Sequence, residues 1–402
     1  MYALSAKFLL NLLGKIYMLN FSFQNTTQII FGEGQIASLK KQIPSDAKIL
    51  LTYGGGSIKS NGIYDQVAAA LSEHTVFEFS GIEPNPSYDT LMKAQAIIKE
   101  NNVDFILAVG GGSVVDGSKF IAAAALYEGE DAWNIVAKQE RITKALPLAC
   151  VLTLPATGSE SNTGAVVTRD GNKLPFASPL VRPIFAVLDP SVTLSLSDRQ
   201  IGNGIVDAFV HTIEQYLTYS VNAKVQDRFA EGLLLTLIED GPKIFAPETS
   251  KDLDIRGNTM WAATMALNGL IGAGVPQDWA THMIGHELTG THGIDHARTL
   301  SIVLPAVMKV CKEAKREKLL QYGERVWNIT EGDEDSRIDR AIELTEQFFT
   351  TMQVPTRLSH VDLGEADIDL LIEKLTSHGM VKLGEHKAVT PDVSREILMT
   401  AL

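Results

Sequence analysis

The stretch "VDFILAVGGGSVVDGSKFIAAAAL", residues 103–126, joins an apolar run to an alanine-rich run through three glycines and a serine. The apolar run is typical of a buried strand, and the alanine-rich run is typical of a helix. Glycines at this junction leave backbone amides and a helix N-terminus open to an anion such as a pyrophosphate. A tight turn that needs glycine for its backbone angles is an equally simple interpretation.

The same plan occurs earlier in the chain. "AKILLTY", residues 47–53, precedes Gly54-Gly55-Gly56-Ser57, and the helical pattern "GIYDQVAAALSE" follows it. Further strands are expected at residues 148–155 and 184–190. Strands that alternate with helices predict a parallel sheet of Rossmann-like type, and the repeated loop favours a dinucleotide ligand. Neither loop has the G-x-G-x-x-G spacing of an ordinary Rossmann fingerprint.

Beyond residue 191 the pattern changes to long stretches with helical periodicity, at residues 204–218, 227–241 and 259–274. We therefore predict a dinucleotide-binding α/β domain over residues 18–190 and an all-helical, metal-binding domain over residues 191–402. A cleft between the two halves is the expected place for a ligand.

Composition limits the functions that the chain can have. Its 402 residues carry a formal charge of −13 and only two cysteines, Cys150 and Cys311. An acidic chain without clustered Lys and Arg argues against a nucleic-acid or membrane-surface partner. Two distant cysteines exclude a disulfide framework and favour a reducing cytoplasm. No run reaches the roughly 18 apolar residues of a membrane span.

Residues 1–17, "MYALSAKFLLNLLGKIY", need a separate interpretation. Asn11 and Gly14 interrupt the apolar run, and no small-x-small cleavage pattern follows, so a secretory leader is disfavoured. We expect an N-terminal extension that is not part of the native fold, with Met18 as the functional start. A small amphipathic helix is the alternative.

The loops offer candidate contacts for a cofactor. Asp116 could accept from a ribose or amide group, or could simply favour the first helical turn. "TLPATGSES", residues 153–161, is a third loop with small hydroxyl residues after a strand. The candidate cofactor-binding residues from the loops are Gly54, Gly55, Ser57, Gly111, Gly112, Ser113, Asp116, Thr153 and Thr157.

The first loop also predicts which dinucleotide binds. NAD-selective sites often place an acid at a strand end to hold the ribose 2′-hydroxyl. Here the strand ends in Tyr53 and three glycines without an acid, and Lys59 follows closely. The sequence therefore favours NADP(H).

"THMIGHELTGTHGIDHART", residues 281–299, holds four of the nine histidines of the chain. His282 and His286 are four residues apart, as are Asp207 and His211, so each pair shares a helix face. Each pair alone could be a polar stripe or an intrahelical carboxylate–imidazole pair. Gly290 and Gly293 can end the helix and return His296 to the same point, and the combined set then suits a divalent Fe²⁺ or Zn²⁺ ion. "HMIGH" lacks the glutamate of a zinc peptidase.

Four motifs together resemble the iron-containing, group III alcohol dehydrogenases. They are "GGGSVVDGSKF", "LPATGSESN", "NGIVDAFVHTIEQY" and "THMIGHELTGTHGIDHA", and the likeness runs from about Met18 to the C-terminus. Within the family the chain is most similar to the branch of NADPH-dependent aldehyde reductases and butanol dehydrogenases. The resemblance implies a dehydroquinate synthase-like architecture with the metal in the cleft, and a homodimer.

The resemblance also implies roles for individual residues. The family's metal ligands fall on Asp207, His211, His282 and His296, while His286 becomes a cleft residue near the nicotinamide. Gly111, Gly112 and Ser113 match the phosphate loop, with Asp116 nearby, and Lys173 matches a lysine that approaches the cofactor ribose. His292 has no role that can be assigned.

The expected chemistry is reversible hydride transfer between NADP(H) and an aldehyde/primary alcohol pair, assisted by one divalent metal ion. Asp207 and His282 are expected to act through the metal, and His286 or solvent is expected to deliver the proton. An NAD-dependent, glycerol-type polyol dehydrogenase is the nearest alternative. A dehydroquinate-synthase-like lyase and a non-catalytic metal-binding protein are more distant ones.

Overall fold

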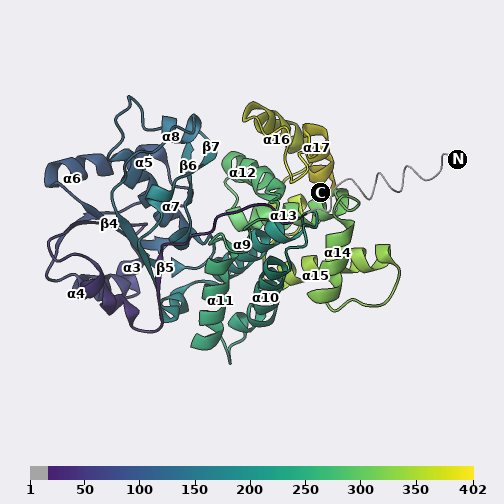
Figure 1. Ribbon diagram of the computed structural model, residues 1–402, viewed down its shortest axis with the longest axis horizontal. Helices are drawn as coiled ribbons and strands as arrows, with labels where there is room; N and C mark the ends of the chain where they lie inside the picture. The colour runs from purple at the N-terminus through teal and green to yellow at the C-terminus, as the bar shows by residue number, and fades with distance from the viewer. Residues whose placement is uncertain (1–16) are drawn as a thin grey trace.

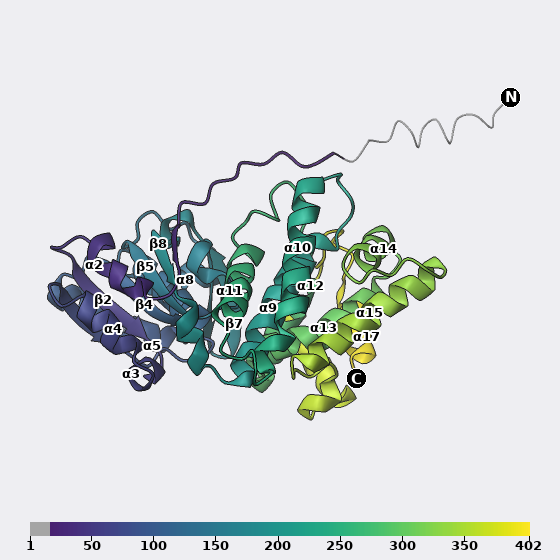
Figure 2. The same cartoon turned by 90° about the horizontal axis from the view of Figure 1, so that it is seen from below.

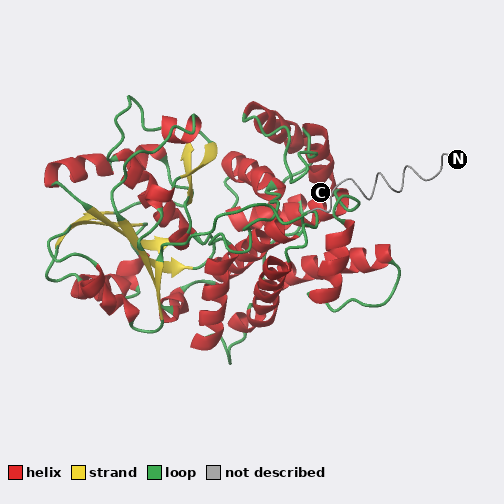
Figure 3. Cartoon of the chain, in the orientation of Figure 1, coloured by secondary structure: helices red, strands yellow, loops and turns green. Residues whose placement is uncertain are grey.

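The computed structural model describes residues 17–402 and has a two-domain fold. A sheet covered by helices forms the N-terminal part, and helices alone form most of the rest of the molecule (Figures 1 and 3). The predicted fold class is thus confirmed. The prediction that residues 1–17 are an extension falls, apart from Tyr17, on residues outside those described.

The main sheet has six strands, all parallel, in the order β1-β8-β5-β4-β2-β3. Their bounds are β1 (Gln28–Phe31), β2 (Lys48–Tyr53), β3 (Thr75–Phe79), β4 (Phe105–Gly111), β5 (Leu148–Leu154) and β8 (Phe185–Leu188). The four strands predicted from apolar runs, β2, β4, β5 and β8, are confirmed. These runs do not alternate because helices cover both faces of a parallel sheet.

An antiparallel hairpin of β6 (Gly164–Arg169) and β7 (Asn172–Ala177) lies outside the main sheet. No strands were expected at these residues. Its two-residue turn consists of Asp170 and Gly171, which have φ of 52° and 74°. The hairpin contacts α7 and α12, and so it reaches from the sheet domain to the helical domain.

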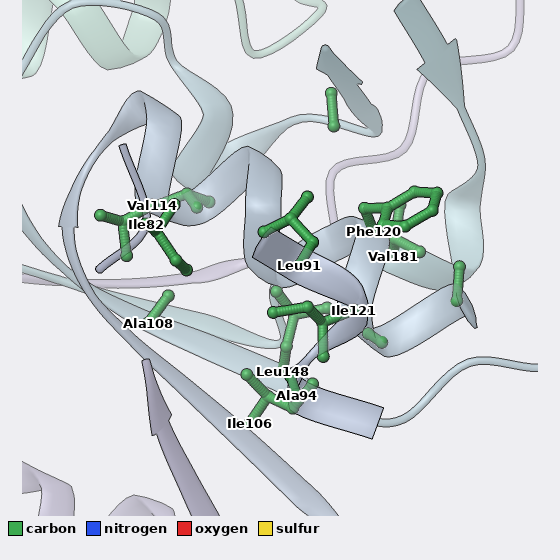
Figure 4. Packing of buried hydrophobic residues seen from close by; sticks show 14 of the residues in the cluster. Ile82, Leu91, Ala94, Ile106, Ala108, Val114, Phe120, Ile121, Leu148 and Val181 are labelled. Carbon is green, nitrogen blue, oxygen red and sulfur yellow. The ribbon is translucent and has the colours of Figure 1, made fainter. Parts of the chain in front are cut away.

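Short and medium helices cover the sheet. They are α2 (Leu39–Gln42), α3 (Ser57–Ser60), α4 (Ile63–Ala70), α5 (Tyr88–Met92), α6 (Ala94–Asn101), α7 (Gly112–Ala124) and α8 (Asn134–Ala137). On one face Leu91, Ala94 and Ile121 pack against Ile106 and Leu148 of the sheet (Figure 4). A second cluster, which includes Val67 of α4, covers the other face. Both faces of the sheet are therefore buried.

The helical part of the chain follows a 3-10 helix at Pro190–Ser195. Its helices are α9 (Asp198–Tyr216), α10 (Lys224–Asp240), α11 (Leu253–Ala266), α12 (Ala280–His292), α13 (His296–Val310), α14 (Arg316–Arg325), α15 (Glu334–Thr351), α16 (Glu365–Ser377) and α17 (Pro391–Thr400). Other 3-10 helices are Gln35–Ser38, Ser159–Ser161, Pro179–Val181, Pro242–Phe245 and Leu358–Val361. Among the residues that the structure describes, none of the helices has the length and apolar character needed to cross a bilayer.

Helix α9 lies at the centre of this domain and contacts α10, α11 and α13. A capping box of Ser197 and Gln200 fixes its start. Helix α11 stops at Ala266, so the periodic stretch over residues 259–274 is helical only in its first part. Of the two glycines expected to end the histidine-bearing helix, Gly293, with φ of 69°, does so, and Gly290 lies inside α12.

Candidate active site

A cavity of about 1090 Å³ extends from the carboxyl ends of β2, β4 and β5 to helices α9, α12 and α13. Residues on both sides of position 190 line it. Ligands of open α/β sheets bind at the carboxyl ends of the strands, and pockets for small ligands measure roughly 300–1,000 Å³. The cavity therefore has room for a dinucleotide together with a small substrate.

Both glycine loops line this cavity. Its wall includes the predicted loop residues Gly54, Gly55, Ser57, Gly111, Gly112 and Ser113. The expectation that a turn demands glycine for its angles is wrong at residues 110–112, where φ is not positive. Glycine is required there for space, since a Cβ on Gly110 would lie 2.5 Å from Cγ2 of Val114.

Gly112→Ala is expected to weaken binding of NADPH, the cofactor that the sequence favours, about tenfold. A Cβ on Gly112, the first residue of α7, would lie 2.5 Å from Oγ1 of Thr157, so the helix start or the third loop must move. Titration of NADPH fluorescence measures the dissociation constant. Gly232→Ala on α10, where the Cβ meets nothing within 4 Å, is the control. An unchanged constant would show that this packing does not shape the phosphate loop.

Asp116 stabilises the third loop. Oδ1 of Asp116 accepts from the hydroxyl of Ser159 at 2.5 Å, and Oδ2 of Asp116 accepts from the amide of Val166 at 3.0 Å. Burial raises the pKa of this carboxyl. Asp116, Thr153 and Thr157 all line the cavity, so each is placed where a cofactor contact is possible.

Lys173 and Lys59, the two lysines singled out from the sequence, make different contacts. Lys173 on β7 lines the cavity, and burial lowers its pKa to about 8. Lys59 forms an ion pair with Glu78 of β3, with 2.9 Å between Nζ and Oε2. Glu78 also accepts from the hydroxyls of Tyr53 and Tyr64. An acid missed by the sequence analysis therefore lies beside the first loop, but three side chains already occupy its oxygens.

The end of the cavity at α9, α12 and α13 brings three of the four predicted metal ligands into one group, and His211 lies beside Asp207 but outside that group. Oδ1 of Asp207 lies 3.8 Å from Nε2 of His211, 4.0 Å from Nε2 of His282 and 3.8 Å from Nε2 of His296. Asp207, His282 and His296 each offer one ligand atom, and these three atoms all lie within 4.8 Å of one another. Ligands at about 2.1 Å from a zinc ion lie at most about 4.2 Å apart, so distances near 4 Å suit a shared ion.

The chemistry of these groups fits a cation. Oδ1 of Asp207 and Nε2 of His282 are buried and have no hydrogen-bond partner among the described residues. Burial lowers the pKa of His211 and of His282 to about 4, and it lowers the pKa of His296 well below the ordinary value. The imidazoles are therefore neutral at neutral pH, as metal ligation requires.

Glu214 orients His282 and was not found from the sequence. Its Oε2 bonds to Nδ1 of His282, and its Oε1 accepts from the amides of Thr281, at 2.8 Å, and His282, at 3.3 Å. A carboxylate on one ring nitrogen fixes the ring so that the other nitrogen faces the ion. Asp207, His211 and Glu214 share one face of α9, and this spacing is the signal that could have identified Glu214.

Comparisons with known proteins agree with this site. Residues 26–190 match the family described as "Iron-containing alcohol dehydrogenase", and residues 202–401 match "Fe-containing alcohol dehydrogenase family, C-terminal". The chain is 59% identical to the "NADPH-dependent aldehyde reductase YqhD" of Escherichia coli K12 over 388 residues, which cover 96% of this chain and 100% of the relative. The chain belongs to the iron-containing alcohol dehydrogenase family.

Further comparisons with a curated relative and with solved structures agree with this membership. The chain is 39% identical to the "Probable NADH-dependent butanol dehydrogenase 1" of Bacillus subtilis over 96% of this chain and 100% of the relative. The crystal structure of E. coli YqhD matches with a TM-score of 0.94 and 58% identity, over 96% of this chain and 100% of that one. The NADH-dependent butanol dehydrogenase A of Thermotoga maritima gives 0.91 and 34%, over 96% and 99%.

Of the two further histidines in this stretch of the iron-containing alcohol dehydrogenase, only His286 is placed near the candidate metal site. His286 lines the cavity, and its ring centroid is 5.0 Å from that of His296 and 6.3 Å from that of His282. Burial lowers the pKa of His286 well below its usual range. Nε2 of His292 is buried without a hydrogen-bond partner among the described residues, and the structure gives this residue no assignable role.

Proposed function

We propose that the protein catalyses the reversible reduction of aldehydes to primary alcohols with NADP(H) and one divalent metal ion. The observation that carries this proposal is the convergence of Asp207, His282 and His296 in the cavity that both glycine loops line. A 59% identical relative is named an NADPH-dependent aldehyde reductase, and a 39% identical one is named a probable NADH-dependent butanol dehydrogenase.

Asp207, His211, His282 and His296 would hold the ion, and Glu214 holds the ring of His282 in place. When bound, a divalent ion polarises a carbonyl oxygen as a Lewis acid, and NADPH supplies the hydride. His286 lines the cavity beside two of these histidines, and a ring nitrogen of His286 is our candidate to pass a proton between solvent and the product oxygen.

The two glycine loops would bind different parts of the cofactor. Gly111, Gly112 and Ser113 lie at the N-terminus of α7, where backbone amides suit the pyrophosphate. Gly54, Gly55 and Ser57 would receive the adenosine end, and Lys173 would approach the ribose. The preference for NADP(H) is supported by the 59% identical relative, which is named NADPH-dependent. Glu78, the acid near the first loop, is held by Lys59 and two tyrosines and so is not free to accept from a 2′-hydroxyl.

NADPH oxidation against a series of short-chain aldehydes tests the function, with protein whose bound metal has been identified by elemental analysis. We expect turnover with aldehydes and a kcat/KM for NADPH that exceeds the value for NADH. A polyol dehydrogenase would instead oxidise glycerol with NAD⁺, and a lyase would show no net change in NADPH. Absence of NADPH oxidation with every aldehyde would overturn the proposal.

The finer assignments are also proposals. We propose the domain division at residue 190, a cytoplasmic location, and Fe²⁺ or Zn²⁺ as the ion. The location is supported by Cys150 and Cys311, which are both free thiols. Elemental analysis decides between iron and zinc.

We further propose a homodimer. The segment from residue 17 runs extended along the helical domain (Figure 2), where the amide of Leu19 donates to the carbonyl of Gly274. Leu19, Phe21 and Phe23 in this segment are each more than 40% exposed, which supports a covered surface in solution. Light scattering at the exit of a sizing column measures the mass.

A further inference from the structure

Trp279, directly before α12, has an unusual backbone. Its φ of 63° and ψ of 8° lie in the left-handed region, which bulky side chains rarely adopt. Such a conformation persists only where the surrounding structure enforces it, and residues of this kind cluster at functional sites. Contacts with the surrounding structure must therefore restrain the backbone of Trp279, and the indole is a candidate functional side chain.

The backbone of Trp279 is restrained by a buried cluster of charged side chains that includes the preceding residue, Asp278. The carboxylate of Asp278 lies 2.7 Å from Nζ of Lys315, which also lies 2.8 Å from Glu385. These three side chains are only 3–5% exposed. We call Asp278, Lys315 and Glu385 the clamp.

The clamp is fixed to the backbone on both sides of the tryptophan. The amide of Asp278 donates to the carbonyl of Glu214 at 2.9 Å, and Oδ1 of Asp278 accepts from the amide of Ala280 at 3.0 Å. Lys315 donates to the carbonyl of Leu217, the residue after α9, at 2.7 Å. The backbone of Trp279 is thus tied to α9, which also carries Asp207 and His211.

The indole stands beside the candidate metal ligands. Its ring centroid lies 5.3 Å from that of His282 and 6.2 Å from that of His211, and it meets both rings edge to face. The indole nitrogen donates to Oε1 of Gln277 at 2.8 Å, which fixes the rotamer. Trp279 lines the cavity together with Leu267 and Met283. A rigid apolar wall therefore borders the place where a substrate carbonyl would meet the ion.

We propose that Trp279 determines which aldehydes the enzyme accepts, with the clamp as its positioning device. This inference rests on the proposed function. The indole limits the length and branching of the aldehyde chain, so short unbranched aldehydes are the preferred substrates. One methylene more or less in an apolar pocket changes kcat/KM about 10–200-fold, so a wall of this size can set the preference.

The test compares kcat/KM for octanal with that for propanal in wild-type enzyme, Trp279→Phe and Trp279→Ala. We expect the octanal-to-propanal ratio to rise at least tenfold in Trp279→Ala and less in Trp279→Phe. Metal content and NADPH affinity are measured on the same preparations. A ratio within twofold of wild type in variants that retain metal and NADPH overturns the inference.

A second substitution guards against a folding defect. Trp279→Gly removes the indole and also suits the left-handed backbone, and it should raise the ratio as Trp279→Ala does. If Trp279→Ala fails to fold, the Gly variant decides: a raised ratio supports the inference and an unchanged ratio overturns it. Wild-type enzyme without activity on any aldehyde would instead refute the proposed function, so the two failures are distinguishable.

A separate variant tests the role of the clamp. Asp278→Asn removes the charge that pairs with Lys315 but keeps the acceptor for the amide of Ala280. We expect the octanal-to-propanal ratio to rise, whereas a merely structural role would lower the activity on both aldehydes equally. Glu313→Gln, which breaks an exposed ion pair with Arg316, is the matched control and should leave the ratio unchanged.

Discussion

Asp207→Ala should lose the bound metal and lower kcat/KM by at least about a thousandfold, because a Lewis acid contributes several kcal/mol of charge stabilisation in the transition state. Oδ1 of Asp207 lies 3.8–4.0 Å from the Nε2 atoms of three histidines, so removing it takes away the centre of the ligand set. His282→Ala should behave in the same way. Elemental analysis and NADPH-linked kinetics on one preparation measure both effects.

Asp240→Asn is a suitable control for this experiment. Asp240 is an acid of similar burial on α10, and its partners are Lys243 and Asn258, away from the cavity. It should keep its metal and its activity. A metal-free but active Asp207→Ala enzyme would remove the basis for the metal assignment.

Gly55→Asp should move the cofactor preference from NADPH towards NADH. A carboxylate at the end of β2 accepts from a ribose 2′-hydroxyl and repels a 2′-phosphate. A Cβ on Gly55 meets nothing within 4 Å and the backbone φ is not positive, so the new side chain fits without strain. We expect kcat/KM for NADPH to fall about a hundredfold while that for NADH is retained or rises.

Gly55→Asn separates charge from size, since asparagine has nearly the same shape and no charge. It should lower kcat/KM for NADPH much less than Gly55→Asp does. Equal losses in the two variants would show that the loop does not lie against the 2′-phosphate. Steady-state kinetics with both cofactors at saturating aldehyde provide the comparison.

Local pattern predicted most of the sheet and the long helices, but the β6–β7 hairpin was missed. The sequence nevertheless contains a signal for this hairpin. Asp170-Gly171 between two extended segments is typical of a two-residue hairpin turn with positive φ at both positions. The hairpin is important for the site because β7 carries Lys173 into the cavity.

The candidate site was predictable in part. The four-residue steps place Asp207 with His211 and His282 with His286, and Gly293 turns the chain so that His296 begins α13 near the same point. Contacts between distant segments were not predictable. Glu214 of α9 bonds to His282 of α12, and Glu78 pairs with Lys59. The buried Asp278–Lys315 pair joins residues 37 positions apart.

The most direct test of the account is a crystal structure of the metal-loaded enzyme with anomalous data collected at the absorption edge of the metal found by elemental analysis. We predict one anomalous peak about 2.0–2.2 Å from Oδ1 of Asp207 and from Nε2 of His211, His282 and His296. A peak elsewhere, or one with these side chains beyond coordination distance, would contradict it.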